Sequence, residues 1–483
     1  MKQFKPYDPD QDFLLPPSPR DWLPEKHLAY VLRDVVGELD LSAIYRAYEH
    51  ADDRGQPPYD PALMVTLLLY GYCVGVPSSR RIERATWDDV GFRVLAADAH
   101  PDHDSLAAFR QRHLSALAAL FVQVLQLCRK AGLVKLGHVA LDGTKVQANA
   151  SKHKAMSYGR MGEAEATLQA EVDALLAEAA QVDAAEDAQY GQGRQADELP
   201  EELRRREPRL AKIRAAKAAL EAEARAAAAA KAAEVQERLA ERARIEEERG
   251  RKFGGRPPAA PDPEKAAPDP KAQKNFTDPD SRIMLDGATK GFVQAYNAQA
   301  AVDGDAQVIV ACAVTQQAND KAQLAPMAQE IEKNLGEKPA QLSADAGYGS
   351  EDNLTAAAVQ GIDLYVPPER EKKLPSVAEP PAPLPAEETR QTAAAPQPVP
   401  APSTAEATKT AEMRAKLRTP AGRAVYARRK GIVEPVFGQI KEARGFRRFL
   451  LRGLTQVAAE WALICMTHNI LKLYRQRYAE KAN

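Results

Sequence analysis

A segment from about Met161 to Arg251 constrains the fold of this chain more than any other stretch. Its composition changes to Ala, Glu, Arg and Gln, and larger apolar residues recur at helical spacing in two stripes. The sequence DAQYGQGRQADELP interrupts the pattern between the stripes. We therefore expect two long helices packed back to back, with an Ala-rich contact that buries little area per residue. The first stripe comprises Leu168, Val172, Leu175 and Leu176, and the second comprises Leu203, Leu210, Ile213 and Leu220.

Strand-like sequences flank this helical segment on both sides. KLGHVALDGTKVQANA precedes it and is expected to form a strand that ends at Asp142, because β-branched valines alternate with other residues. After the Pro-rich GGRPPAAPDPEKAAPDP, GFVQAYNAQAAVD and QVIVACAVT predict two strands joined by a Gly-Asp hairpin. A helix from near Asp320, a strand ending at Asp345, a helix capped by Ser350 and the strand DLYVPP complete the order. This succession predicts an α/β fold, an RNase H-like mixed sheet interrupted by a long helical insertion.

Helical patterns dominate both ends of the chain. LAYVLRDVV and PALMVTLLLYGYCVGV predict buried helices within residues 1–130, with Pro61 at an early helical position. Arginine-bearing helices follow and suit an all-α DNA-binding module, although core helices with basic outer faces would look the same. Near the C-terminus, VYARRKGIVEPVFGQIKEARGFRRF predicts a helix in which Pro435 requires a kink or a helix start near Glu434. The closing TQVAAEWALICMTHNILKLYRQRY predicts an amphipathic helix packed on the sheet.

Length and cysteine usage narrow the class of protein. A chain of 483 residues exceeds the size of a single growing core, so we expect several domains or one domain with large insertions. The four cysteines, Cys73, Cys128, Cys312 and Cys465, lie far apart without zinc-like spacing and fit a reducing cytoplasm. The sequence contains no apolar run of about 18 residues and starts without the apolar stretch of a signal peptide. We expect a cytoplasmic protein with no membrane partner.

The net charge of −1 hides a gradient along the chain. From Lys409 to Asn483, 17 Lys and Arg residues stand against 5 Asp and Glu residues. This segment is a candidate phosphate-binding surface, and we expect the N-terminal arginines to contribute to it, although solvated helix faces would have the same composition. The N-terminal candidates for phosphate contacts are Arg80, Arg81, Arg84, Arg110 and Arg112.

Three acidic residues on separate elements are the candidate catalytic and metal-binding residues. Asp142 and Asp345 each end an apolar strand before a glycine-containing turn, and Glu434 lies on a basic helix. Strand-end Asp residues are common structural caps, so a catalytic role is favoured only by the presence of all three acids together. Two Mg²⁺ ions about 4 Å apart can activate water, neutralise a phosphate and stabilise a leaving oxygen. Carboxylates suit Mg²⁺, with Mn²⁺ as a substitute. We expect Asp142 to bridge two ions and the other two acids to flank them.

Several words of the sequence, in order, carry a resemblance to a known family. LDGTKVQANASKH, TDPDSRIM, YNAQAAVD, NDKAQLAPM and SADAGYGSEDN resemble the DDE transposases of bacterial insertion sequences, specifically the group of insertion sequence eleven-eighty-two. PYDPALMVTLLLYGY and HPDHDSLAAFRQRH extend the resemblance over most of the chain. It implies a DNA-cutting and DNA-joining enzyme with an RNase H-like catalytic core.

The resemblance also assigns residues around the third acid. Such transposases carry a tyrosine, a basic residue, the catalytic glutamate and a lysine, which here correspond to Tyr426, Lys430, Glu434 and Lys441. The basic position has lysine where the family has arginine, and Tyr426 lies one residue further upstream than the pattern expects. In a regular α-helix Lys441 would share a face with Glu434 and reach a phosphate beside the metals. These residues, together with Arg429, are predicted to contact DNA, although Lys441 would look the same as an ordinary exposed lysine.

The predicted domains follow from these assignments. We expect a DNA-binding domain over 1–130, three parts of the catalytic domain over 131–160, 276–366 and 409–483, a helical hairpin with a Pro-rich connector over 161–275, and a Pro/Ala-rich linker over 367–408.

The expected function is transposition, in which inverted-repeat ends are bound and cut and their 3′-hydroxyls are joined to target DNA. The expected partners are double-stranded DNA and at least one further copy of the chain. Two alternatives stay open, a nuclease of the same fold without strand transfer and a catalytically silent DNA-binding scaffold.

Overall fold

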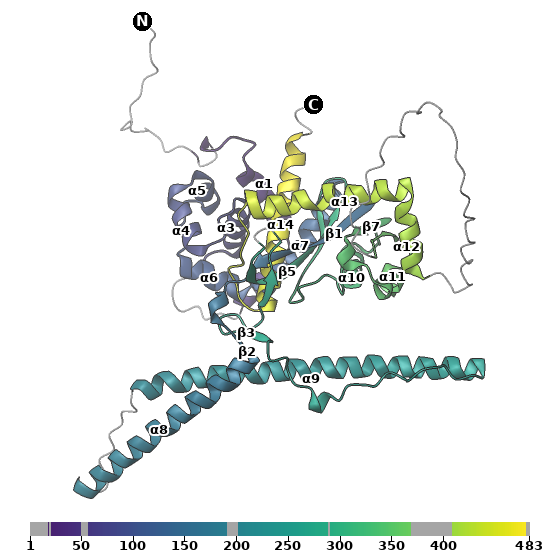
Figure 1. Cartoon of the computed structure of the whole chain (residues 1–483). Coiled ribbons are helices and arrows are strands. Elements are labelled where there is room, and N and C mark those ends of the chain that lie inside the picture. The colour runs from purple at the N-terminus through teal and green to yellow at the C-terminus, as the bar shows by residue number, and fades with distance from the viewer. Residues whose placement is uncertain are drawn as a thin grey trace, which may run out of the picture. The chain divides into compact units, whose positions relative to one another are not determined.

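A computed structural model describes residues 18, 21–49, 57–190, 201–287, 290–368 and 408–479, without the side chains of 178–204 (Figure 1). The predicted linker over 367–408 lies almost wholly outside these residues. The chain divides into two compact units. The core unit comprises Met1–Val146, Asn297–Arg447 and Thr455–Asn483, and the arm unit comprises Gln147–Tyr296 and Arg448–Leu454. The helices of the first 130 residues thus share a unit with most of the sheet, and their role as a DNA-binding domain stays a prediction.

The N-terminal helices of the core unit form around one fully apolar helix. Asp60 caps α3 by accepting a hydrogen bond from the amide of Ala62, and Pro61 occupies the first turn as expected. Almost every side chain of α3 is buried, which explains its continuous apolar run. The seven helices described here are α1 (Leu28–Glu38), α2 (Ser42–Tyr45), α3 (Pro61–Cys73), α4 (Ser79–Asp88), α5 (Val90–Ala96), α6 (His103–Arg112) and α7 (Leu114–Lys130).

Within the described residues, six strands form a mixed sheet in which β1 is central. β1 lies between β5 and β7, as expected for the strand that carries Asp142. It runs parallel to β7, which runs parallel to β8, whereas β5 pairs antiparallel with both β4 and β6. The strands are β1 (His138–Gln147), β4 (Arg282–Leu285), β5 (Phe292–Asp303), β6 (Ile309–Thr315), β7 (Gln341–Ala344) and β8 (Asp363–Tyr365).

Helices from the second half of the chain pack on this sheet. The predicted closing helix is present as α14, but it is not amphipathic as expected, because eight consecutive residues, Leu463–Ile470, are buried on all sides of it. Polar side chains of α14 fix it to two strands. Trp461 Nε1 donates to the Gln299 carbonyl at 2.9 Å, and Asn469 exchanges two hydrogen bonds with the backbone of Ile309. The helices are α10 (Leu324–Leu335), α11 (Glu351–Thr355), α12 (Lys409–Arg418), α13 (Pro420–Gly438), the π-helix η7 (Gln439–Ala443) and α14 (Leu454–Ala479).

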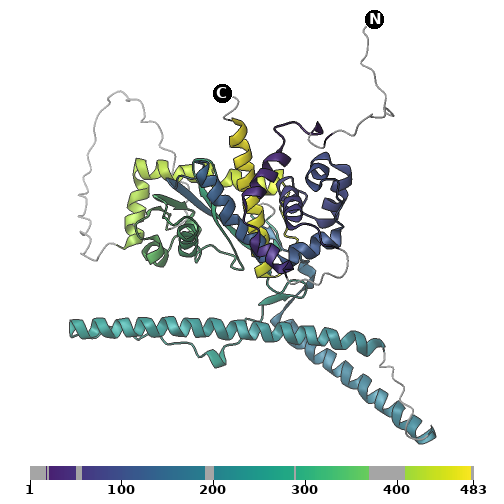
Figure 2. The same cartoon turned by 180° about the vertical axis from the view of Figure 1, so that it is seen from behind.

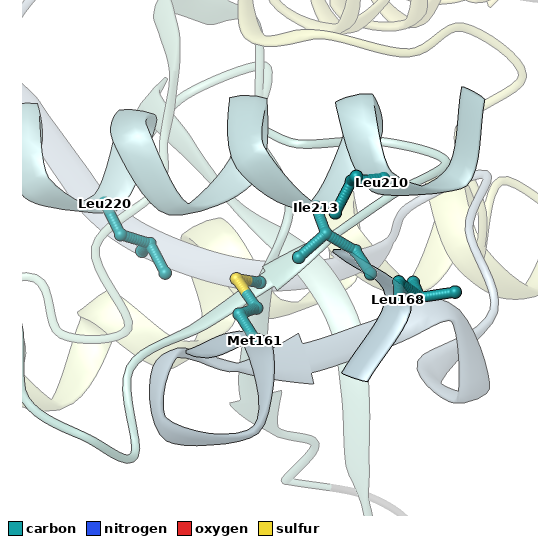
Figure 3. Packing of buried hydrophobic residues seen from close by; sticks show 5 residues of the cluster. All are labelled: Met161, Leu168, Leu210, Ile213 and Leu220. Atoms are coloured by element: carbon teal, nitrogen blue, oxygen red, sulfur yellow. The ribbon is translucent and has the colours of Figure 1, made fainter. Parts of the chain in front are cut away.

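The arm unit contains the predicted pair of long helices, α8 (Tyr158–Tyr190) and α9 (Glu201–Arg249), seen from both sides in Figures 1 and 2. A two-stranded sheet of β2 (Ala155–Ser157) and β3 (Gln273–Asn275) lies at their base. Figure 3 shows the apolar contact between the helices, which is confined to one end of α9 and formed by Met161, Leu168, Leu210, Ile213 and Leu220.

The apolar contact between α8 and α9 includes fewer residues than the two predicted apolar stripes. Leu176 is 45% exposed, so its assignment to the packed stripe is wrong, and the side chain of Leu203 lies outside the described residues. Beyond Leu220 every side chain of α9 is at least partly exposed, and the returning chain runs along the helix (Figure 1). Arg242 donates to the Phe253 carbonyl at 3.0 Å and so ties this return to α9. Ion pairs of Glu223 with Lys274 and Arg282 join α9 to β3 and β4.

None of the helices in the described parts of the chain combines the length and the apolarity that a membrane crossing needs.

Candidate active site

The register of two parallel strands places Asp142 beside Asp345. His138 pairs with Gln341 and Leu141 with Ala344, so paired residues differ by 203 in number. Asp142 and Asp345 differ by the same 203 and are therefore the next pair in register, where the ladder ends. Neighbouring strands lie about 4.8 Å apart, and residues in register on them share a face of the sheet. The predicted proximity of these two acids is thus a consequence of β1–β7 pairing.

Asp142 itself lies within β1 and not at its end, which corrects the expected strand boundary. The strand continues to Gln147 after the pairing with β7 has stopped. Asp142 accepts hydrogen bonds from the Gly143 amide at 2.8 Å and from Arg429 Nη1 on α13 at 2.8 Å. Burial raises the pKa of the Asp142 carboxyl to about 6, against the opposing effect of Arg429 and with a further increase from Asp345. The carboxylate therefore lies in an environment that favours a nearby positive charge.

Asp345 follows β7 directly and begins a tight turn. Its carboxylate accepts a hydrogen bond from the Gly347 amide at 2.8 Å, which caps the short helix η5 (Ala346–Tyr348). The Tyr348 side chain is fully buried, and burial raises the pKa of its hydroxyl well above the ordinary value. Asn353 donates to the Tyr348 carbonyl at 2.6 Å and holds the turn in place. Ser350 caps the following helix by accepting from the Asn353 amide, as predicted.

A further carboxylate, Asp320, lies at the same edge and was not among the predicted site residues. Asn297 and Gln299 of β5 donate to its Oδ1 at 2.6 and 2.7 Å. A Cβ at position 143 would lie 2.5 Å from that oxygen and 2.3 Å from Gln299 Nε2, so a side chain after Asp142 would require the Asp320 and Gln299 side chains to shift. A Cβ at position 347 would lie 2.9 Å from Asp345 Oδ1 and 3.6 Å from Asp320 Oδ2. Asp320 thus lies next to Gly143, which follows Asp142, and near Gly347, which lies two residues after Asp345.

The sequence of β5 indicates that a polar group lies opposite it, although composition and periodicity do not identify Asp320. Asp320 lies in NDKAQLAPM, which predicts only the start of a helix near this residue, whereas α10 begins at Leu324. The alternation of β5 puts Asn297 and Gln299 on one face of a buried strand. Two buried amides on one face require polar partners, so the strand predicts a polar group opposite them without identifying Asp320.

One lysine, Lys145, lies beside these acids, and a second, Lys441, contacts its backbone. Burial lowers the pKa of Lys145, whereas Asp320, Asp142 and Asp345 act to raise it. Lys441 Nζ donates to the Lys145 carbonyl at 2.7 Å, so Lys441 contacts β1 three residues beyond Asp142. The predicted role of Lys441 as a DNA contact stays a prediction. The α-helical phase that linked it to Glu434 does not apply, because η7 interposes a π-helix, a wider turn than the α-helix.

Glu434 lies on an exposed face of α13, and the effect expected of Pro435 differs in the structure. The helix begins at Pro420 and continues through Pro435 to Gly438, so it does not start near Glu434. Proline cannot donate to the carbonyl four residues earlier, that of Gly431. Gln307 Nε2 donates to this carbonyl at 3.0 Å and replaces the lost bond. Glu434 is not among the groups found to act on the carboxyl of Asp142, and its place as the third acid stays a prediction.

The donor groups at this edge fit a hard divalent cation. Across the described residues, no three His, Cys, Asp or Glu side chains are grouped as a ready metal cluster. Carboxylate oxygens of Asp142, Asp345 and Asp320 nevertheless lie around one strand end. Asn297 is fully buried, and its Oδ1 has no hydrogen-bond partner among the described residues. Carboxylate and amide oxygens are the ligands that Mg²⁺ and Mn²⁺ prefer.

The residues predicted to contact DNA divide into buried and exposed groups. Arg429 is 6% exposed and paired with Asp142, and Arg110 is 9% exposed and donates to the Pro77 carbonyl at 3.0 Å. Both guanidinium groups thus bind other groups of the protein, and the phosphate contacts predicted for these two arginines stay predictions. Tyr426 is half-buried and lies below the Arg429 guanidinium. The exposed candidates are Lys430, Arg80, Arg81, Arg112 and Arg84, of which the last forms an ion pair with Asp88 at 2.9 Å.

The basic C-terminal segment is likewise not uniformly a surface. Arg444 is buried and donates to Thr467 Oγ1 at 2.8 Å and to the Ile464 carbonyl at 3.0 Å. Burial lowers its pKa to about 10. Lys416 pairs with Asp363 on β8. Part of the positive charge that predicted phosphate binding therefore holds the core together.

Comparison with known families agrees with this arrangement. Residues 17–112 match the model of a transposase domain (DUF772), and residues 272–470 match that of the transposase DDE domain. No curated protein and no solved structure matches the chain. The DDE match contains Asp345 and Glu434 but starts after the arm helices, so it does not reach Asp142. The β1–β7 pairing places Asp142 beside Asp345. Two separate parts of the chain thus match models of transposase domains.

Proposed function

We propose that this protein is a transposase that binds the inverted-repeat ends of an insertion sequence, cleaves their phosphodiesters and joins the 3′-hydroxyls to target DNA. One observation carries the proposal most directly: Asp142 and Asp345 are neighbours in register within a chain that matches the transposase DDE domain. The central parallel strand β1, with the antiparallel β5–β6 pair and the parallel β7 and β8, supports an RNase H-like core.

We further propose that Asp142, Asp345 and Glu434 hold two Mg²⁺ ions, with Mn²⁺ as a substitute. Bound ions would supply the positive charge that neutralises the phosphate and lowers the pKa of attacking water. The chain's own groups prepare this site. Arg429 orients the Asp142 carboxylate, and the Gly347 amide fixes that of Asp345. The side chains of Lys145 and Lys441 bring positive charge beside the acids, where a DNA phosphate would lie.

A glycine in the site and exposed arginines outside it support the approach of DNA. Gly143 leaves no side chain between Asp142 and the Asn297 and Gln299 amides, so the carboxylate network stays compact. The arginines of α4 and α6 that are exposed, Arg80, Arg81 and Arg112, extend the proposed contact to DNA outside the cleavage site. Transposition joins two element ends, so we propose at least a dimer on DNA.

The test is a cleavage and joining assay with labelled duplexes that carry the DNA flanking the coding frame. We expect Mg²⁺-dependent nicks at the ends and transfer of a pre-cut 3′-end into a plasmid. Cleavage without transfer would identify a nuclease, and binding without cleavage in Mg²⁺ or Mn²⁺ would identify a DNA-binding scaffold. Either result would contradict the proposal.

A further inference from the structure

A hollow of about 690 Å³ in the arm unit gathers positive charge where α8 and α9 meet the small sheet. Met156, Ile213 and Phe276 form its apolar part. Its other walls are strongly basic. The basic side chains that line it are His153, Lys154, Arg160, Arg205, Arg209 and Lys212.

A second hollow of about 600 Å³ adjoins the first in the same unit. The two share His153, Lys154 and Thr277 as lining residues, so they lie on either side of one short turn. Lys152, Arg448 and Arg452 add positive charge to the second hollow. We call the two hollows together the basic groove. Its residues belong to Gln147–Tyr296 and Arg448–Leu454, which form one compact unit.

Local structure explains why these cations gather. Arg205, Arg209 and Lys212 are spaced by four and three residues, so they share one face of α9. Ser151 caps the turn of η3 (Lys152–Lys154) by accepting from the His153 amide, and this presents three basic residues in succession.

On the opposite side of the turn, two arginines are held by the chain beside them. Arg452 donates to the Asn149 carbonyl at 2.9 Å, and Arg448 donates to Gln147 Oε1 at 3.2 Å. These bonds fix two guanidinium groups at the second hollow and leave their remaining N–H groups for another acceptor.

The charge of the groove is not balanced from within. Among the lining residues found in the described parts of the chain, none is Asp or Glu. Other basic residues of the arm are paired with acids, as Arg214 and Lys217 are with Glu165 across the helix pair. Lys154, Arg160, Arg209 and Lys212 are exposed. Clustered like charges repel one another, and a bound polyanion would remove this repulsion and so be held by the cluster.

We propose that the basic groove binds the phosphodiester backbone of duplex DNA, a contact that rests on the proposed function and places DNA at the root of the arm. Two adjoining hollows with cations on both sides of one turn match successive phosphates along a strand. Grooves for single strands use several aromatic side chains as stacking platforms, and here Phe276 is the one Phe, Tyr or Trp among the described residues that line either hollow, beside the imidazole of His153. Duplex backbone therefore fits better than a single strand.

The test uses the full-length protein and a fluorescent random-sequence duplex, with affinity measured by anisotropy over a range of salt concentrations. The variant combines Arg160→Gln, Arg209→Gln and Lys212→Gln, which removes three charges from exposed positions. Each lost phosphate contact lowers the slope of log affinity against log salt by about 0.9. We expect the slope to fall by about 2 to 3 and the affinity at low salt to fall at least about tenfold. Lys152→Gln with Lys154→Gln should have a smaller effect in the same direction.

A matched control removes three charges from the far part of α9, with Lys231→Gln, Arg238→Gln and Arg244→Gln. These residues are exposed and line neither hollow. We expect this control to retain most of the affinity and the slope. Equal losses in the variant and the control would overturn the groove and leave a diffuse charge effect.

Three other outcomes are decisive. Unchanged binding by the folded groove variant would overturn the site while the proposed function stands. A wild-type protein that binds no duplex at any salt concentration would overturn both. Binding of a labelled poly-glutamate peptide that the groove variant loses, with duplex affinity intact, would replace DNA with an acidic protein partner.

Discussion

Two regions supply the proposed catalytic acids, and they fix their side chains by different means. β1 and β7 fix Asp142 and Asp345 through backbone pairing, which sets their register. α13 carries Glu434 on an exposed face, next to Pro435 and just before the π-helix η7. A ladder of hydrogen bonds determines a position to within one residue, because a slip by one residue reverses every side chain. α13 has no such ladder and is held by side-chain contacts, such as the Arg429–Asp142 ion pair, while the π-helix η7 changes the α-helical phase after Glu434.

The strand acids should give the largest effect. We expect Asp142→Asn and Asp345→Asn each to lower cleavage by on the order of a thousandfold or more, because each removes a metal-ligand charge without changing volume. Asp142→Asn should also lower the free energy of unfolding by roughly 2 kcal/mol, since it leaves the buried Arg429 without its carboxylate. Cleavage kinetics and urea unfolding measure the two effects. Retained cleavage by either variant in Mg²⁺ would remove that residue from the site.

Glu434→Gln should separate the helix acid from the strand acids. If Glu434 completes the site, cleavage falls by on the order of a hundredfold or more. The free energy of unfolding should stay within about 0.5 kcal/mol of the wild type, because the side chain is exposed. DNA binding without metal should be unchanged. Wild-type cleavage rates in this variant would mean that the site uses the strand acids with a different third ligand, for which Asp320→Asn is the next variant.

Arg429→Gln should have an intermediate effect and tests the role of the Arg429–Asp142 pair. We expect cleavage to fall about tenfold and the free energy of unfolding to fall by roughly 2 kcal/mol, since a charged hydrogen bond to Asp142 is lost. The salt dependence of DNA binding should stay as in the wild type, because the guanidinium is buried. A slope reduced by about 0.9 would instead restore Arg429 as a phosphate contact. Lys430→Gln, at the exposed neighbouring position, is the comparison variant, and its slope should fall by about 0.9 if Lys430 contacts a phosphate.

Pro435→Ala should give the smallest effect, because Gln307 already satisfies the Gly431 carbonyl. We expect the free energy of unfolding to change by no more than about 1 kcal/mol. A double-mutant cycle with Gln307→Ala sharpens this prediction. Gln307→Ala should destabilise the protein more when Pro435 is present than in the Pro435→Ala background, where a backbone amide can take its place. Equal costs in both backgrounds, measured by urea unfolding, would show that Gln307 does not compensate for the proline.

Much of the fold follows from local sequence patterns. The alternation in VALDGTKV and the apolar runs of GFVQAYNAQAAVD and QVIVACAVT predict strands that the structure contains, and the Ala-rich stretch predicts α8 and α9. These patterns are local, so a single chain segment is sufficient to reveal them. The arm contact was overestimated, because Leu176 has helical spacing yet lies beyond the part of α8 that α9 covers.

The site was only partly predictable because its key contacts join distant segments. Asp142 and Asp345 could be named as strand-end acids, although the pairing that unites them spans 203 residues. The Asp320 network and the Arg429 ion pair depend on three-dimensional proximity that no spacing encodes. The sequence predicts that basic residues lie on the surface. Arg429 and Arg110 are nevertheless buried, which depends on segments that pack over them from elsewhere in the chain.

Iron-directed cleavage of the polypeptide tests the central claim most directly, namely that Asp142, Asp345 and Glu434 hold the metal ions. Fe²⁺ bound in place of Mg²⁺ generates hydroxyl radicals with ascorbate and peroxide, and these cut the backbone beside the metal ligands. The account predicts three sets of fragments, with cuts near residues 142, 345 and 434, all suppressed by excess Mg²⁺ and by Asp142→Asn. Cuts that avoid residues 142 and 345, or that persist in Asp142→Asn, would contradict a metal site at this edge of the sheet.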